Sequence, residues 1–113
     1  MSDCLFCRIV AGEIPSTVVL ETDEVLAFRD IAPAAPTHVV VVPKEHHVDV
    51  VALTATDPDL AGRLLAAGAA VAAQEGLGEG FRLVFNTGAH AGQTVFHLHL
   101  HVLGGRPMSW PPG

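Results

Sequence analysis

Basic residues are scarce in this sequence. Its 113 residues include six lysines and arginines against twelve aspartates and glutamates, which gives a net charge of −6 when the histidines are neutral. A protein that binds nucleic acid or an anionic membrane surface needs basic side chains to neutralise phosphate groups. We therefore expect no nucleic acid and no membrane as partners.

Long hydrophobic runs are also missing. The most apolar stretch, 60–73, is interrupted by Arg63 and is shorter than the roughly 20 residues that span a bilayer. The first ten residues contain an acid, Asp3, and lack the apolar core of a secretory signal. We expect no such signal and a cytoplasmic protein.

Cysteine is nearly absent, since the chain has only two. Two cysteines cannot build a disulfide framework. The spacing of Cys4 and Cys7, a C-x-x-C pair, leaves three interpretations open: small buried residues, a redox pair or two metal ligands.

The remaining composition predicts one folded domain. Half of the residues are apolar and 16% are charged, which is typical of a globular chain and not of a disordered one. Because no repeat or linker interrupts the sequence, residues 1–113 are interpreted as a single domain with an extended, proline-containing tail at 104–113.

Hydrophobic patterns predict an α+β fold with a mainly antiparallel five-stranded sheet. A long helix is expected at 57–75, because Asp57 suits the N-cap, Pro58 suits the first turn and Gly76 follows the last periodic residue. We also expect a short N-terminal helix at 4–10 and a helical turn near 47–53. The strands are expected at 17–21, 25–30, 37–42, 81–86 and 95–103.

Histidine is unusually frequent, with seven in the chain. His97, His99 and His101 alternate with aliphatic residues, so on a strand the three imidazoles would share one face at intervals of about 6.6–7 Å. Such a row can be a solvated polar face, a metal site or a catalytic row. The alternation alone does not decide between them.

The segment before this row, 86–94, is rich in glycine and small polar residues. Glycines can expose main-chain N–H groups that bind an anion, and Asn86, Gln93 and Thr94 add neutral donors. Alone, such a segment is an ordinary connection between two strands. Beside three histidines it predicts a phosphate-binding loop.

Several segments together resemble the histidine triad (HIT) family, and its Hint-like branch in particular. The resemblance covers nearly the whole chain in the family's order. It is carried by His97-Leu98-His99-Leu100-His101-Val102, by Ala91-Gly92-Gln93-Thr94-Val95-Phe96, by Phe28-Arg29-Asp30-Ile31 with Ala35-Pro36-Thr37-His38, and by Gly104-Gly105-Arg106 with Trp110-Pro111-Pro112-Gly113.

The resemblance implies a purine nucleoside phosphoramidase. Such an enzyme cleaves the P–N bond of AMP–amine conjugates through a nucleotidyl-histidine intermediate, here on His99. Two alternatives remain open within the resemblance: a dinucleoside polyphosphate hydrolase, and a non-enzymatic nucleotide- or zinc-binding interaction protein. Without the resemblance, the row would also suggest zinc hydrolase chemistry at all three histidines.

The resemblance also assigns roles to individual residues. His99 would be the nucleophile, His101 a donor to the phosphate, and His38 a residue that orients the row. Thr94 stands where serine is usual in the family and keeps the hydroxyl. The implied nucleotide-binding set comprises Asp30, Ile31, Asn86, Gly92, Gln93, Thr94, His99 and His101, with Phe6, Ile9 and Phe28 around the base.

Many bacterial members carry the cysteine pair and bind structural zinc. The matching ligands here are Cys4, Cys7, His46 and His97, a closed set of the structural type. His47 is the alternative ligand.

The remaining expectations concern His90 and the partner. His90 is expected to be an exposed loop residue. The family also implies a homodimer, with Trp110 and the tail near the partner's site.

Overall fold

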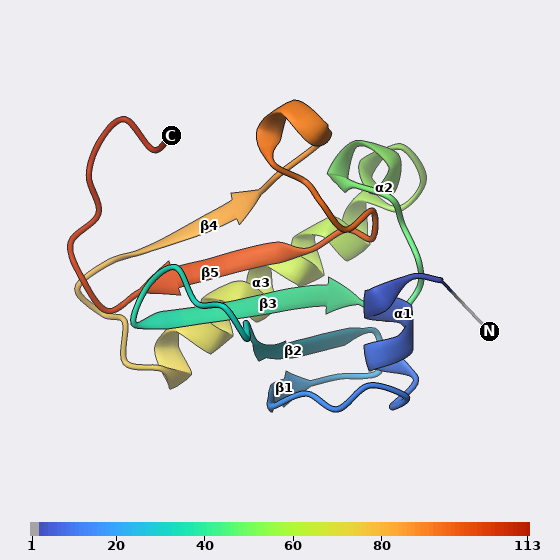
Figure 1. The fold of residues 1–113 in the computed structure, drawn as a ribbon, viewed down its shortest axis with the longest axis horizontal. Coiled ribbons are helices and arrows are strands. Elements are labelled where there is room, and N and C mark those ends of the chain that lie inside the picture. The colour runs from blue at the N-terminus through green and yellow to red at the C-terminus, as the bar shows by residue number, and fades with distance from the viewer. Residues whose placement is uncertain (1–2) are drawn as a thin grey trace.

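The protein is built around a five-stranded sheet, as described for residues 3–113 by a computed structural model. The strand order is β1-β2-β3-β5-β4, and all neighbours are antiparallel (Figure 1). The expected α+β fold is therefore confirmed. The strands are β1 (Val18–Glu21), β2 (Val25–Arg29), β3 (Thr37–Pro43), β4 (Phe81–Phe85) and β5 (Leu100–Gly104).

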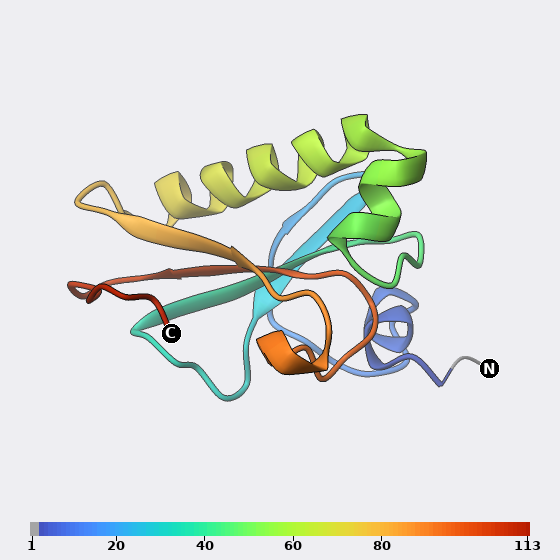
Figure 2. The ribbon, with the colours of Figure 1, turned by 90° about the horizontal axis from the view of Figure 1, so that it is seen from above.

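The long helix α3 (Pro58–Gln74) lies along one face of the sheet (Figure 2). It begins where the sequence predicts, because the Asp57 side chain accepts a hydrogen bond from the Leu60 N–H at 3.1 Å. It ends before Gly76, whose φ of +73° suits glycine.

Three shorter helical elements accompany α3 in residues 3–113. The helix α1 (Leu5–Val10) and the 3-10 turn η1 (Ala89–Ala91) lie on the face of the sheet opposite α3 (Figure 2). The expected turn near 47–53 is a regular helix, α2 (Val50–Thr56). Asp49 caps it by accepting from the Ala52 N–H at 2.8 Å.

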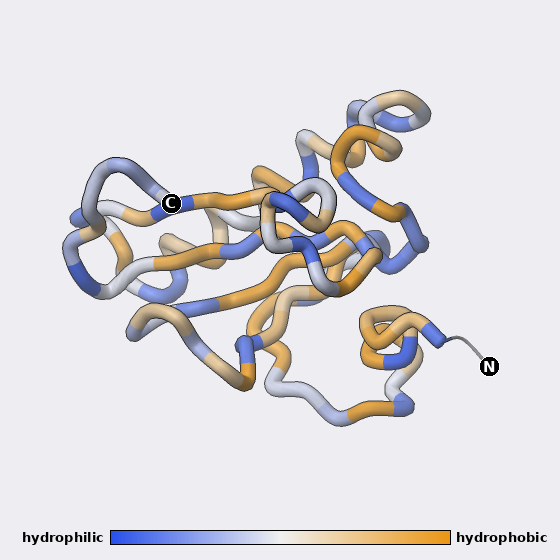
Figure 3. The backbone as a smooth tube through the Cα atoms, turned by 45° about the horizontal axis from the view of Figure 1, so that its top comes forward, coloured by the Kyte–Doolittle hydropathy of each residue, from blue (hydrophilic) through white to orange (hydrophobic). Residues whose placement is uncertain are grey.

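The strands β2 and β3 are buried on both faces. Leu64 and Val71 of α3 are fully buried in a cluster that contains Leu100 and Val102 of β5. A second cluster lies under α1 and contains Phe6, Leu26, Phe28, Val40 and Val42. The tube in Figure 3 accordingly shows its hydrophobic colour along the strands and its hydrophilic colour mainly in the connections.

The last strand differs from the prediction, which was wrong about its start. β5 begins at Leu100 and not at residue 95. Its partner β3 ends at Pro43, which has no N–H to continue the ladder, and the Leu98 N–H donates instead to the His47 carbonyl at 2.6 Å. Only His101 of the histidine row therefore lies within the strand.

The lengths and compositions of the helices can be compared with those of a membrane span. Of the helices formed between residues 3 and 113, none has the length and apolar composition required to cross a membrane.

Candidate active site and metal centre

His99 is held with one ring nitrogen available for chemistry. Its Nδ1–H donates to the His97 carbonyl at 2.8 Å. A neutral imidazole carries a single N–H, so the lone pair of His99 lies on Nε2. The ring is 8% exposed and meets the edge of Phe6 at a centroid distance of 4.9 Å. His99 is therefore oriented and in the tautomer that a nucleophile needs.

His38 and His101 form a hydrogen-bonded pair whose direction is fixed by the backbone. The Ala34 N–H donates to His38 Nδ1 at 3.0 Å, so the hydrogen of neutral His38 lies on Nε2. That hydrogen is donated to His101 Nδ1 at 2.8 Å. His101 consequently carries its own hydrogen on Nε2 and can act as a donor.

Both rings of this pair are neutral near pH 7. Burial, with smaller contributions from neighbouring His99 and His38, lowers the pKa of His101 to about 4, against the opposing effect of Asp30. Burial also lowers the pKa of His38, against the attraction of Asp30. Neutral rings are the condition under which the hydrogen-bond directions above hold.

Asp30 lies at the edge of this pair, at the end of β2. Its Oδ2 is 3.5 Å from His38 Nε2, and its Oδ1 accepts from the Ala32 N–H at 2.8 Å. Ile31, next to it, is 100% exposed. The predicted sugar-binding residues therefore lie beside the histidine row, and their contact with ribose stays a prediction.

The predicted phosphate loop is closed by its own hydrogen bonds. The N–H groups of Gly92 and Gln93 donate to the carbonyls of Ala89 and Gly88 at 3.0 and 3.1 Å. Thr94 is exposed. The main-chain N–H groups of Gly92 and Gln93 already have acceptors. Among the predicted phosphate contacts of this loop, the Thr94 hydroxyl is therefore better placed to bind a phosphate.

The Gln93 side chain is engaged by protein groups, and its predicted contact with a nucleotide stays a prediction. It is 3% exposed, and its Oε1 accepts from the Gly88 N–H at 2.8 Å. Its Nε2 donates to the carbonyls of Val48 and Val95 at 2.8 and 3.2 Å. The side chain thus fixes the loop to the segment before α2. Asn86 is half-buried at the start of the same loop.

The predicted base pocket lies next to the nucleophile. Phe6 and Phe28 are buried with a centroid distance of 5.6 Å, and Ile9 packs against the same cluster. Because Phe6 also contacts His99, this apolar wall and the reactive ring are neighbours. Contact with a base remains a prediction.

A second cluster, of sulfur and nitrogen ligands, is formed at the other end of the row. The ligand atoms of Cys4, Cys7, His46 and His97 all lie within 4.8 Å of one another. His97 Nδ1 is 3.3 Å from Cys4 Sγ, 3.4 Å from Cys7 Sγ and 3.2 Å from His46 Nδ1. Ligands of a tetrahedral zinc ion are separated by about 3.3–3.8 Å, so this set fits zinc.

The neighbours of His97 support the same conclusion. Its Nε2–H donates to the Pro43 carbonyl at 2.8 Å, which leaves Nδ1 unprotonated toward the cluster. The alternative ligand, His47, directs its Nε2 to the Glu45 carboxylate at 3.2 Å, and it is not part of the group of metal-ligating atoms. His90 is exposed, as expected.

Two contributors to the site could not be found by side-chain type, and a third has a role that the sequence does not predict. They are the Ala34 N–H, the Pro43 carbonyl and the side-chain amide of Gln93 in its structural role. Alanine and proline offer no polar side chain, so the sequence carries no signal for the first two. For Gln93, the polar residue is evident in the sequence but its burial is not.

Comparisons with known proteins find similar sequences and a similar structure. The model of the HIT domain matches residues 11–108. A crystal structure of a HIT family hydrolase from Legionella pneumophila superimposes with a TM-score of 0.94 and 51% identity, covering 98% of this chain and 100% of that one.

Two plant sequences are also similar. An adenylylsulfatase of Arabidopsis thaliana is 49% identical, covering 99% of this chain and 78% of that protein. A 14 kDa zinc-binding protein of Brassica juncea is 46% identical, covering 98% and 100%.

Proposed function

This chain belongs to the HIT family, and from that premise we propose that it hydrolyses purine nucleoside 5′-phosphoramidates, with His99 as the nucleophile. The relatives named as a hydrolase and as an adenylylsulfatase support hydrolysis at an adenylyl group. Cleavage of a P–N bond in AMP–amine conjugates is the more specific part of the proposal.

One observation carries the proposal: the tautomer of His99. Because its Nδ1–H is committed to the His97 carbonyl at 2.8 Å, the lone pair of the neutral ring lies on Nε2, the atom that would attack phosphorus. The neighbouring His101 ring, at a centroid distance of 4.9 Å, offers an Nε2–H that can stabilise charge on a phosphate oxygen.

The reaction proceeds in two steps. His99 Nε2 forms a bond to the α-phosphorus while the P–N bond breaks, and the amine leaves with that electron pair and takes a proton from solvent. Water then attacks the same phosphorus, the bond to His99 breaks, and its electron pair returns to Nε2. The proton of the attacking water goes to solvent, and AMP is released.

The metal centre has a structural role in this proposal. Cys4, Cys7, His46 and His97 would hold zinc, which would fix α1 against the end of β3. The named zinc-binding relative supports this assignment. His97 is then committed to the metal, and the reaction is left to His99 and His101.

A second candidate substrate is adenylyl sulfate, which is favoured by the name of the Arabidopsis relative. The same attack by His99 would release sulfate instead of an amine. Sulfate leaves as an anion without a proton, so the two substrates differ in their need for proton transfer to the leaving group.

The test uses the variant His99→Ala. We expect kcat/KM for an AMP–amine conjugate to fall by at least about a thousandfold, because the nucleophile is removed. Rates on adenylyl sulfate and diadenosine tetraphosphate would rank the substrate classes. An alkaline quench during turnover should leave AMP on the peptide that contains His99, detected by mass spectrometry.

His90→Ala is the matched control, because His90 is an exposed histidine outside the row and its loss should leave the rate unchanged. Persistent turnover by His99→Ala, or adenylylation of another residue, would contradict the assignment.

A further inference from the structure

We propose that the turn formed by Gly105 and Arg106 positions the histidine row. It holds residues 34–36, at the end of the loop between β2 and β3, so that the Ala34 N–H fixes the hydrogen of His38 and, through His38, that of His101. This inference rests on the proposed function, and it adds residues that act without touching the substrate.

Gly105 brings the turn against the loop. Its φ is +93°, and a β-carbon at this position would lie 2.9 Å from Pro36 Cβ and 3.4 Å from the Thr37 nitrogen. A distance under 3 Å is not tolerated without movement of the neighbour, so only glycine allows this approach. The turn and the end of the loop are therefore packed directly together.

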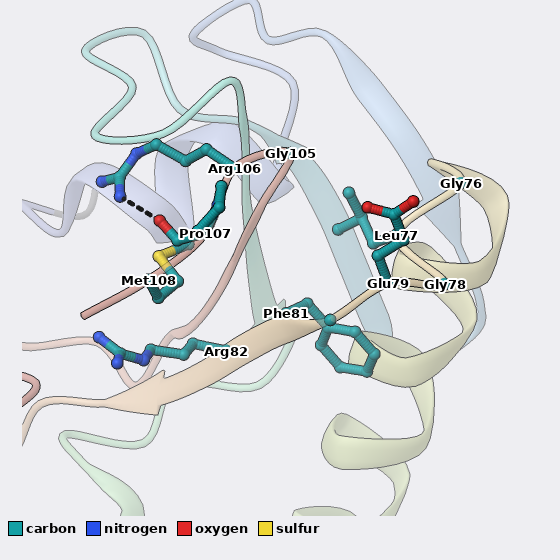
Figure 4. Close-up of a pocket in the computed structure, with 11 residues that line it drawn as sticks. Gly76, Leu77, Gly78, Glu79, Phe81, Arg82, Gly105, Arg106, Pro107 and Met108 are labelled. Atoms are coloured by element: carbon teal, nitrogen blue, oxygen red, sulfur yellow. Dashed lines mark hydrogen bonds between the residues drawn. The ribbon is translucent and has the colours of Figure 1, made fainter. Parts of the chain in front are cut away.

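Arg106 adds a hydrogen bond to the same loop. Its Nη2 donates to the Ala34 carbonyl at 3.2 Å, and its Nη1 donates to the Pro107 carbonyl at 3.1 Å. Figure 4 shows the second of these bonds. The guanidinium thereby ties Ala34 to the tail that follows β5.

Ala34 links the turn of Gly105 and Arg106 to the histidines. Its carbonyl accepts from Arg106, and its N–H donates to His38 Nδ1 at 3.0 Å. If Ala34 moves, His38 loses the donor that keeps its hydrogen on Nε2. His38 can then carry its single hydrogen on Nδ1, so that its Nε2 becomes an acceptor. Across the 2.8 Å contact between the two rings, His101 would then donate from Nδ1 and would no longer hold its hydrogen on Nε2.

A second arginine provides a matched control. Arg82 lines the same pocket as Arg106, with Met108 between them (Figure 4). Arg82 donates to the carbonyl of Ser109 in the tail. Arg82→Ala removes the same charge and a similar hydrogen bond to a carbonyl. It leaves the contact between Arg106 and the Ala34 carbonyl intact.

The experiment compares Arg106→Ala, Arg106→Lys and Arg82→Ala in the full chain with its metal. With an AMP–amine conjugate, we expect Arg106→Ala to lower kcat about fivefold, the size of one lost hydrogen bond, while KM changes less than twofold. Arg106→Lys should recover part of kcat, because an ammonium can still donate to one carbonyl. Arg82→Ala should match the unmodified protein.

Nitrogen NMR of the histidine rings reports the tautomers without any substrate. The unmodified protein should show His38 and His101 with hydrogen on Nε2 and His99 with hydrogen on Nδ1. In Arg106→Ala, the signals of His38 and His101 should move toward a mixture of tautomers, while those of His99 stay in place. A purely structural role would not produce this selective change.

Gly105→Ala is the second variant. It perturbs the same turn because the added β-carbon would press against Pro36. It should shift the same two rings as Arg106→Ala. Unchanged His38 and His101 signals in both variants would overturn the proposal, as would an equal loss of kcat in Arg82→Ala. If the unmodified protein shows the expected tautomers but cleaves no P–N bond, the proposed function fails while the positioning role is still decided by the NMR signals.

Discussion

At the scale of single residues, backbone groups set the tautomers of three histidines. The His97 carbonyl orients His99, the Pro43 carbonyl orients His97, and the Ala34 N–H orients His38. The sequence pattern predicts which imidazoles gather in a row. It cannot predict which nitrogen of each ring carries the hydrogen, because that depends on main-chain atoms brought in from distant segments.

The burial of His38 and His101 predicts how stability depends on pH. The pKa of His101 is 6.5 in its ordinary state and about 4 in the folded protein, and the pKa of His38 is shifted in the same direction. Between these values the unfolded chain binds protons that the folded chain does not. The free energy of unfolding should therefore decrease as the pH falls from about 6.5 to about 4, as measured by urea denaturation.

His101→Gln is the comparison that isolates this effect. The variant lacks the group with the depressed pKa, so its free energy of unfolding should decrease less steeply over the same pH window. Parallel curves for the two proteins would mean that His101 does not titrate as its burial implies.

At the scale of elements, the ends of helices and strands are predicted best where the signal lies in neighbouring residues. The start of α3 is readable because Asp57 and Pro58 act within one turn of the chain. The start of β5 is not, because the alternation of histidine and leucine that begins at His97 extends beyond the point where Pro43 ends the pairing. The contacts that gather the metal ligands are similarly invisible locally, since Cys4 and His97 are 93 positions apart.

The metal centre predicts an effect confined to one helix. Because Cys4 and Cys7 flank the first turn of α1, removal of zinc should release this helix from the sheet. We expect about one zinc per chain and a decrease of Tm by at least about 5 °C with a strong chelator. Hydrogen exchange should rise more in α1 than in α3.

Cys4→Ser offers an independent check of the same site. It should lose the metal and show the same pattern of exchange as the chelated protein. Equal increases in α1 and α3, or full retention of zinc, would contradict the assignment of these ligands.

At the scale of the whole molecule, the surface retains apolar groups that a monomer leaves in water. Trp110 is 82% exposed and Phe81, on the edge strand β4, is 41% exposed. Edge strands and exposed aromatic side chains are typical of interfaces. These features support the homodimer implied by the family, and the dimer stays a proposal.

The dimer proposal predicts a mass of twice 11.8 kDa by light scattering at micromolar concentration. Trp110→Ala, which removes apolar surface from the tail, should shift the equilibrium toward the monomer on dilution. A monomeric mass for the unmodified protein at micromolar concentration would contradict the proposal.

The Ala34 N–H has a consequence for metal selectivity. Asp30, His38 and His101 also bring three potential ligand atoms within 4.8 Å, but the nitrogen that His38 presents there carries a hydrogen as long as Ala34 donates to the opposite side of the ring. A protonated nitrogen cannot coordinate a cation. The Ala34 N–H therefore disfavours cation binding by His38 at one end of the row, whereas at the other end His97 presents an unprotonated Nδ1 to the proposed zinc site.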